Sequence, residues 1–300
     1  FKIILYAADR AAADAASKAA FARVAALDAM MSDYRPDSEL MRLCHKAGGG
    51  PVHVSDELFF VLSRAQEVSR ISDGAFDVTV GPVVKLWRRS RRSGQLPDPD
   101  ELKHALARVG WQKVRLDAKA HTVQLLVPGM QLDLGGIAKG YAADEALEEL
   151  ERHHVTRALV AASGDIAVSG PPPDADGWKV GIAPLEDDNA APKRYLMLKD
   201  AAVSTSGDAE QYVEIGGKRY SHIVDPKTGI GLVGRMSATV VARHGVMADS
   251  LTKVVAVLGE RGLAIIDKLG EGTAALLVRK TDQGEEVLTS KRWPEVHHKE

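Results

Sequence analysis

The stretch Tyr212-Val-Glu-Ile-Gly-Gly-Lys-Arg-Tyr-Ser-His-Ile223 decides the class of fold that this sequence predicts. Strand-forming residues flank Gly216-Gly217, and such a pair is typical of the two-residue turn of a β-hairpin, whose central residues need positive φ. A second hairpin is predicted from residues 113–116 and 122–127. Strands joined by short turns pair antiparallel, so we expect antiparallel sheets.

Helical segments lie between these strands. Residues 9–31 carry apolar side chains at helical spacing, and residues 138–153 and 248–258 are also predicted helices. Ser38 and Ser55 are predicted to cap two further helices. Strands outnumber helices and several adjoin as hairpins, which favours an α+β fold with mixed or antiparallel sheets and packed helices. We expect all 300 residues to form one domain, which two intertwined α+β subdomains could build.

Three connecting segments carry weaker signals. Residues 75–80 are predicted to run from a loop into a strand. Residues 87–99 are polar and contain Gly94, Pro97 and Pro99, so we expect a surface loop there. Residues 131–134 are predicted to form a strand that leads into Gly135-Gly136.

The composition excludes several classes of partner and site. The net charge is −2, so no bulk electrostatic attraction to nucleic acid or to an anionic membrane is expected. The basic run at residues 85–92 is short, and we interpret it as solvated. A single cysteine, Cys44, excludes a disulfide or a cysteine-based zinc site within one chain. No run of 18 consecutive apolar residues occurs, so no membrane-spanning segment is predicted.

The stretch Asp133-Leu-Gly-Gly-Ile-Ala-Lys-Gly140 has the features of an anion-binding site. Its glycines let the backbone approach a ligand closely, and the helix that follows offers unpaired N–H groups and a partial positive charge. Lys139 adds a full positive charge in the first turn. The spacing matches neither of the common glycine-rich phosphate motifs. A diphosphate site and a tight structural turn therefore both remain open at this point.

Other polar segments are dense in side chains that can hold ligands. They are residues 33–39, 74–82, 204–208, 220–229 and 247–251. Each also has a structural interpretation. Ser206-Gly-Asp208 fits a turn, His222 fits a satisfied histidine in a strand, and Asp249 fits a carboxylate that complements a helix dipole.

Taken together, these segments resemble the ApbE family, the FAD:protein FMN transferases. The most specific matches are YRPDSEL at residues 34–40, GAFDVTVGPVVKLW at 74–87, DLGGIAKGYAAD at 133–144 and YSHIVDPKTG at 220–229. The resemblance covers nearly the whole chain in order. It implies an α+β protein that uses Mg²⁺ to cleave the pyrophosphate of FAD. FMN would then be attached through its phosphate to a threonine of a target flavoprotein, with release of AMP.

The resemblance also implies roles for individual residues. Tyr34 matches the aromatic residue that packs on the flavin, and Ala75-Phe76-Asp77 matches a stretch that lines the dinucleotide. Lys139 matches the lysine beside the pyrophosphate, and Ser206 is a further flavin-binding candidate. Asp249 and the carbonyl of Gly136 match the metal ligands.

The general base for the acceptor hydroxyl has two candidates. His222 matches the active-site histidine of the family, and Asp208 is the alternative. The sequence does not choose between them. Mg²⁺ prefers oxygen ligands, which suits the carboxylate of Asp249 and the carbonyl of Gly136.

The chain departs from the family pattern at Lys253. Relatives carry a threonine four residues after the metal-binding aspartate, and Thr252 cannot simply replace it because one residue turns a helical side chain by about 100°. A protonated lysine has no lone pair and cannot bind Mg²⁺. Two interpretations stay open. In one, Lys253 pairs with Asp249 and water fills the vacant metal position. In the other, the Lys253 ammonium takes the place of the cation and contacts the pyrophosphate.

The departure keeps two alternative functions open beside FMN transfer: a FAD pyrophosphatase that releases FMN and AMP, and a FAD-binding protein without catalysis. The expected partners are FAD and a flavoprotein with an acceptor threonine, not nucleic acid. The resemblance and the lack of an initial Met lead us to expect a periplasmic or lipid-anchored protein. Any membrane contact would come through an N-terminal lipid anchor outside this sequence.

Overall fold

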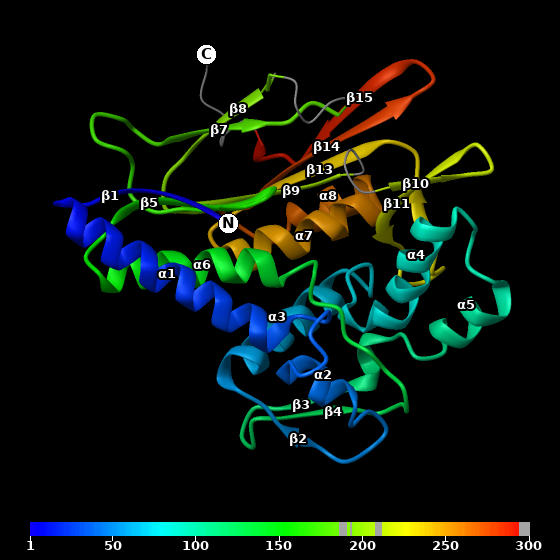
Figure 1. Cartoon of the computed structure of the whole chain (residues 1–300). Coiled ribbons are helices and arrows are strands. Elements are labelled where there is room, and N and C mark those ends of the chain that lie inside the picture. The colour runs from blue at the N-terminus through cyan, green and yellow to red at the C-terminus, as the bar shows by residue number, and fades with distance from the viewer. Residues whose placement is uncertain (186–190, 193, 208–211, 294–300) are drawn as a thin grey trace. The chain divides into compact units, whose positions relative to one another are not determined.

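Figure 1 shows the computed structural model of the chain, which describes residues 1–185, 191–192, 194–207 and 212–293. The chain divides into two compact units, each built from segments far apart in the sequence. Unit 1 comprises Phe1–Leu27, Ile137–Ala209 and Met236–Glu300, and unit 2 comprises Asp28–Gly136 and Glu210–Arg235. Within the described residues, no helix combines the length and hydropathy that crossing a bilayer would require.

Unit 1 is built on a seven-stranded sheet with the strand order β1-β5-β6-β9-β13-β14-β15. The strands are β1 (Lys2–Tyr6), β5 (Arg157–Ala162), β6 (Asp165–Val168), β9 (Ala201–Gly207), β13 (Met236–Ala242), β14 (Ala274–Thr281) and β15 (Gly284–Thr289). A separate pair, β7 (Trp178–Ile182) and β8 (Arg194–Leu198), belongs to the same unit. Each of these strand pairs is antiparallel.

The two faces of this sheet carry different cores. On one face, the sheet packs against the helices α1 (Arg10–Met31), α6 (Ala138–Arg152) and α7 (Gly245–Leu258). This core consists mainly of small side chains, such as Ala158 of the sheet, Ala16 of α1 and Ala143 of α6. The other face packs through larger residues such as Trp178 and Leu196 on the β7-β8 pair. Figure 1 shows these helices and this pair on opposite sides of the sheet. Alternating side chains of each strand reach the two faces, as β geometry requires. A short helix, α8 (Glu260–Ile266), follows α7.

Two facing glycines let α6 and α7 cross closely. A Cβ atom on Gly140 would overlap the carbonyl of Gly245, and one on Gly245 would overlap the carbonyl of Gly140. The residues at the N-cap positions of these helices, Ile137 and His244, make no side-chain cap. The backbones therefore touch directly, and the caps must come from elsewhere.

Each of these helices supplies the cap of the other. Asp144 of α6 accepts hydrogen bonds from the N–H groups of Gly245 at 2.6 Å and Val246 at 3.0 Å. Asp249 of α7 accepts one from the N–H of Gly140 at 3.1 Å. A carboxylate at a helix N-terminus satisfies orphan N–H groups and complements the dipole. This reciprocal capping fixes the start of α6, where Lys139 lies.

Unit 2 combines short helices with two three-stranded sheets of order β2-β4-β3 and β10-β11-β12. The helical segments are α2 (Glu39–Cys44), α3 (Asp56–Ile71), η1 (Val78–Val80), α4 (Gly81–Ser93), α5 (Pro99–Leu106) and η2 (Trp111–Lys113). The strands are β2 (Val52–His53), β3 (Val114–Asp117), β4 (Thr122–Leu125), β10 (Tyr212–Ile215), β11 (Lys218–Val224) and β12 (Gly231–Val233). These strands also pair antiparallel, which confirms the α+β class.

The signals with a definite stereochemical cause are confirmed. Gly216 and Gly217 both have positive φ, and the β10-β11 hairpin pairs Ile215 with Lys218 across them. Ser38 and Ser55 cap α2 and α3, each accepting a hydrogen bond from a backbone N–H three residues later. The second predicted hairpin is β3-β4.

The three weaker expectations were wrong. Residues 87–93 continue α4, because Trp87 is buried and donates a hydrogen bond to the Gly229 carbonyl at 2.8 Å, and Gly94 ends the helix with φ of 69°. Residues 78–80 form a 3-10 turn, since Asp77 accepts a hydrogen bond from the Thr79 N–H. Residues 131–134 form no strand, because their backbone N–H groups do not bond to one neighbouring strand. The N–H of Leu132 donates to the Cys44 sulfur, and the N–H of Asp133 donates to the Val78 carbonyl.

Candidate functional site

Four charged side chains form a cluster in unit 1 beside the start of α6. The charged cluster consists of Lys139, Asp165, Asp249 and Lys253. Lys139 pairs with Asp165, and Lys253 pairs with Asp249 one helical turn before it. Both aspartate side chains are almost fully buried, at 3% and 0% exposure, whereas the Lys139 side chain is 46% exposed. A buried carboxylate therefore holds the ammonium of the half-exposed Lys139 side chain.

Hydrogen bonds from the sheet and from α7 fix this cluster. Asp165 on β6 accepts a hydrogen bond from the hydroxyl of Ser204, its register partner on β9. Thr252 donates its only hydroxyl proton to the Asp249 carbonyl at 2.6 Å. Ser206 therefore donates to Thr252 across the 2.8 Å between their hydroxyl oxygens. Ser206 thus supports the helix turn that carries Asp249.

The electrostatics of the cluster favour the charged form of Lys139. Burial alone would lower the pKa of Lys139, but the carboxylates of Asp165 and Asp249 outweigh it and raise that pKa. Burial raises the pKa of the Asp249 carboxyl, and the ammonium groups of Lys253 and Lys139 oppose that shift. Two carboxylates and two ammonium groups balance, so the cluster holds its buried acids without another cation.

As the side chains stand, Asp249 does not fit a Mg²⁺ ligand. One of its carboxylate oxygens contacts the Lys253 ammonium, and the other accepts the N–H of Gly140. Within the described ranges, no group of three or more histidine, cysteine, aspartate or glutamate side chains is arranged to hold a metal ion. Lys253 therefore pairs with Asp249, as the first of the two interpretations predicts. The same geometry is compatible with the second interpretation, in which the Lys253 ammonium takes the place of the metal ion.

In unit 2, Arg88 of α4 links several of the predicted residues. Its guanidinium donates to Asp33 at 2.5 Å and to Asp133 at 3.0 Å, and it lies 4.3 Å from the centre of the Tyr34 ring. Asp133 also accepts the N–H of Gly135 at 2.8 Å. Tyr34 is 74% exposed, so its ring rests on Arg88 and leaves much of its surface accessible. Such a ring offers a stacking surface to a flat ligand.

Ala75, Phe76 and Asp77 are buried within unit 2. The Asp77 carboxylate accepts hydrogen bonds from the N–H and hydroxyl of Thr79 and from the Trp111 N–H. Burial raises the pKa of Asp77, and these hydrogen bonds oppose the shift. The Asp77 side chain therefore holds its own loop, and contact of this stretch with a dinucleotide stays a prediction.

The remaining predicted residues are placed individually. His222 is half-buried on β11, and Gly136 ends the first segment of unit 2. Asp208 lies outside the described residues. The structure therefore brings Lys139, Ser206, Asp249 and Lys253 together in unit 1, and it connects Tyr34 with the start of the Gly-Gly segment in unit 2.

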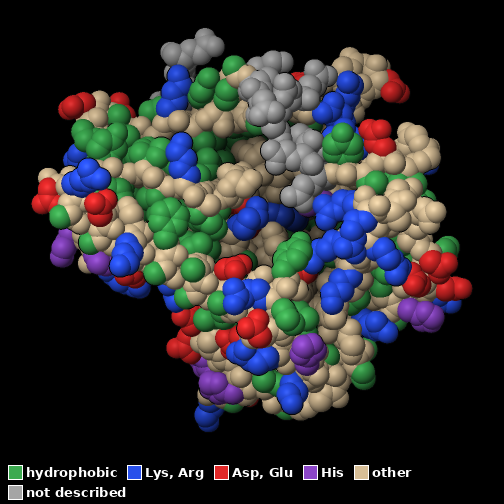
Figure 2. Space-filling view, in the orientation of Figure 1, with side chains coloured by type: hydrophobic (Ala, Val, Ile, Leu, Met, Phe, Trp, Pro, Cys, Tyr) green, Lys and Arg blue, Asp and Glu red, His purple; other side chains and the backbone are tan. Residues whose placement is uncertain are grey.

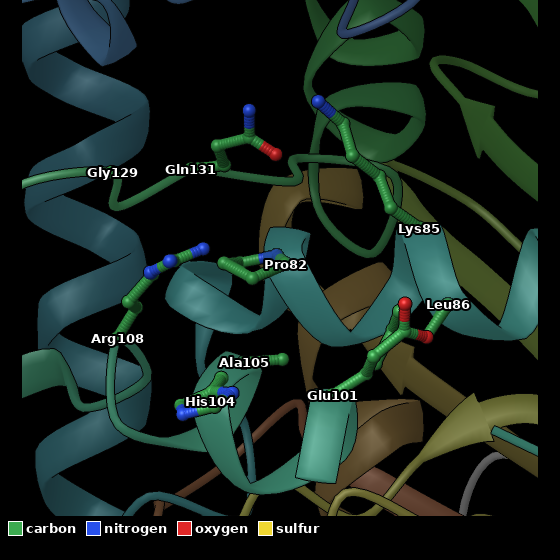
Figure 3. Close-up of a pocket in the computed structure, with 9 residues that line it drawn as sticks. All are labelled: Pro82, Lys85, Leu86, Glu101, His104, Ala105, Arg108, Gly129 and Gln131. Atoms are coloured by element: carbon green, nitrogen blue, oxygen red, sulfur yellow. The ribbon is translucent and has the colours of Figure 1, made fainter. Parts of the chain in front are cut away.

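A separate cavity of about 400 Å³ lies in unit 2 (Figure 3). It is lined by Pro82, Lys85, Leu86, Glu101, His104, Ala105, Arg108, Gly129 and Gln131. None of the predicted flavin-binding residues lines it. Figure 2 shows lysine and arginine side chains gathered over α4, the helix that carries the basic run.

Sequence reasoning missed three residues of this arrangement. Arg88 was interpreted as part of a solvated run, although helical spacing from the apolar Val83 and Trp87 could have shown that α4 continues. Asp144 stands in the DLGGIAKGYAAD motif and caps α7. Asp165, the partner of Lys139, lies on β6 whereas Lys139 lies on α6, and no local pattern predicts this contact between a helix and a strand whose two residues are 26 positions apart.

Comparisons with known proteins point to one family. The model of the ApbE family matches residues 1–277. A FAD:protein FMN transferase of Haemophilus influenzae is 34% identical over 266 residues, which cover 86% of this chain and 76% of that protein. One of Treponema pallidum is 36% identical over 264 residues, with coverage of 83% and 73%.

Solved structures give the same result. The apo form of the flavinyl transferase ApbE of Pseudomonas stutzeri has a TM-score of 0.86 at 29% identity and covers 99% of this chain and 93% of its own. The flavin transferase ApbE of Vibrio cholerae has a TM-score of 0.85 at 28% identity, with coverage of 97% and 92%. Sequence similarity over most of the chain and the shared fold therefore lead to one conclusion: the chain belongs to the ApbE family.

Proposed function

We propose that this chain is a FAD:protein FMN transferase, which moves FMN from FAD to a threonine of a target flavoprotein. The relatives with this name support the proposal through their similarity over most of the chain. In the reaction, the threonine oxygen bonds to the FMN phosphorus, the bond from that phosphorus to the bridging oxygen breaks, and AMP leaves. The hydroxyl proton passes to a base, for which His222 and Asp208 remain the candidates.

The single observation that carries the proposal is the charged cluster at the start of α6. Phosphoryl transfer needs neutralisation of the charge on the phosphate oxygens more than covalent help from the protein. Lys139 presents an ammonium there, the helix start adds a partial positive charge, and buried Asp165 keeps the ammonium in place. A preorganised positive site of this kind stabilises a diphosphate and the transition state derived from it.

Tyr34 and Arg88 supply the other part of the proposal. The exposed Tyr34 ring would stack on the isoalloxazine, while the Arg88 guanidinium contacts the ring through a cation–π interaction. When bound, Mg²⁺ would neutralise phosphate oxygens. The roles of Lys139, Tyr34 and Arg88 require no metal ion, and the Asp249 oxygen that would bind one already contacts the Lys253 ammonium.

The test is incubation with FAD and a flavoprotein that carries the acceptor threonine. We expect covalent flavin on the acceptor, seen by in-gel flavin fluorescence, and release of AMP. An acceptor with alanine in place of that threonine is the matched control and should stay unlabelled. Free FMN with AMP would instead support the pyrophosphatase, and intact bound FAD would support a flavin-binding protein.

A periplasmic or lipid-anchored location is also proposed on the family resemblance alone. Fractionation of the natural host with an antibody against this chain would test it. The chain recovered in the cytosolic fraction would contradict this location without bearing on the transfer reaction.

A further inference from the structure

Lys253 is held in a way that resembles a bound cation. Its ammonium contacts a carboxylate oxygen of Asp249 and donates to the Asp249 carbonyl at 3.0 Å. Asp249 is completely buried, whereas the Lys253 side chain keeps 16% of its surface exposed. The positive charge therefore lies between a buried acid and the surface beside the start of α6.

The charge balance explains why a lysine suits this position. A buried carboxylate without a partner is costly, so Asp249 requires a cation at its oxygen. Lys253 supplies that positive charge from within the chain, because it lies one helical turn after Asp249. A divalent ion at the same oxygen would meet a fixed ammonium and would have to displace it.

Lys253 also keeps a donor for a ligand. An ammonium has three N–H donors, and the described residues engage two of them, both through Asp249. Lys139, which acts electrostatically on the same aspartate, likewise spends one donor on Asp165. Among the residues that the structure describes, these two ammonium groups keep unused donors, and together with the N-terminus of α6 they match a phosphate or diphosphate group.

We propose that Lys253 is a built-in cation, which binds the phosphate oxygens of the ligand directly and makes divalent metal unnecessary for binding. The inference rests on the proposed function, since it takes FAD as the ligand. It excludes high-affinity metal binding at Asp249 in the unmodified chain. Removal of the ammonium, with a hydroxyl oxygen in its place, should create such a site.

The first test measures metal alone, by the loss of the electron paramagnetic resonance signal of free Mn²⁺. Wild type and the Lys268→Thr control, an exposed lysine outside the cluster, should leave the signal unchanged. Lys253→Thr should bind Mn²⁺, because it frees the Asp249 oxygen and offers a second oxygen one turn away. Mn²⁺ binding by wild type that matches binding by Lys253→Thr would overturn the proposal, and so would a folded Lys253→Thr that binds none.

The second test measures FAD affinity by flavin fluorescence in chelator and in Mg²⁺. Wild type should bind equally in both, whereas Lys253→Thr should bind FAD about tenfold more tightly with Mg²⁺ than with chelator. Thermal unfolding shows whether the Lys253→Thr variant is folded. The comparison of wild type in chelator and in Mg²⁺ tests the inference even if that variant does not fold. A wild-type affinity that rises about tenfold with Mg²⁺ would overturn the inference.

A transfer assay with the acceptor flavoprotein separates this inference from the proposed function. Metal-independent FAD binding without transfer would support Lys253 as the cation and contradict the transferase. Transfer by a wild-type chain whose FAD affinity rises about tenfold with Mg²⁺ would support the transferase and contradict the role of Lys253. Absence of FAD binding in both buffers would contradict both.

Discussion

Three carboxylates with little solvent exposure are each paired with a basic side chain to which we assign a part in ligand binding. Asp249 and Asp165 have Lys253 and Lys139, and Asp133 has Arg88. A carboxylate removed from water costs several kcal/mol unless a cation pairs with it. Each basic residue therefore balances the charge of an acid. In addition, Lys139 and Lys253 present positive charge, and Arg88 contacts the exposed ring of Tyr34.

Lys139→Met should weaken FAD binding about tenfold or more, because it removes an ammonium from the phosphate site. Fluorescence titration of FAD measures the affinity. Lys268→Met, at an exposed lysine outside the cluster, is the matched control and should bind as wild type does. Unchanged affinity in a folded Lys139→Met would show that the start of α6 does not bind the diphosphate.

Arg88→Met should destabilise the protein by about 3 kcal/mol, because Asp33 and Asp133 would lose their shared cation in a partly buried site. Urea unfolding measures the loss. Arg92→Met removes an exposed arginine of the same helix and should change stability little. Equal stability of the two variants would mean that Arg88 does not hold the Tyr34 segment.

At the scale of elements, the crossing of α6 and α7 sets the site. The crossing depends on two glycines in contact and on two aspartates that cap the partner helix. Neither helix has a capping side chain of its own at the N-cap position. The start of α6, which carries Lys139, is therefore ordered by α7.

Gly140→Ala should destabilise unit 1 by about 3 kcal/mol, because the added methyl group overlaps the Gly245 backbone. Gly50→Ala is the matched control, since a Cβ there meets nothing within 4 Å. Thermal unfolding compares the two. A Gly140→Ala variant as stable as Gly50→Ala would contradict close packing at the crossing.

The sequence predicted the elements whose signals are local. The Gly216-Gly217 turn and the serine caps depend on neighbouring residues, and they were predicted correctly. The end of α4 was not, because burial of Trp87 depends on Gly229, which lies 142 residues later. Local patterns therefore predict where an element starts and turns, while tertiary contacts decide how far it continues.

At the scale of the whole molecule, the order of strands lay beyond sequence reasoning. The seven-stranded sheet pairs β1 with β5 and β6 with β9, and unit 2 takes its second segment from residues 210–235. No periodicity encodes such distant pairings. The candidate residues came from motifs and the family resemblance, whereas their partners Asp165 and Arg88 required the structure.

Asp144 should make stability depend on pH. Burial raises the pKa of Asp144 from 3.8 to about 7, and the hydrogen bonds from Val246 and Gly245 oppose the shift. Because the folded state holds the proton more tightly, the contribution is fully present below about pH 4 and is lost as pH rises through about 7. The melting temperature of wild type should therefore fall more between pH 5 and pH 8 than that of Asp144→Asn. Parallel pH profiles of the two proteins would rule out this role.

The intact mass of the acceptor flavoprotein, after incubation with this chain and FAD, tests the central claim most directly. We predict a mass increase equal to one FMN attached through its phosphate, located by peptide mapping on the acceptor threonine. An acceptor of unchanged mass, in a reaction where this chain binds FAD, would contradict the assignment as a FAD:protein FMN transferase.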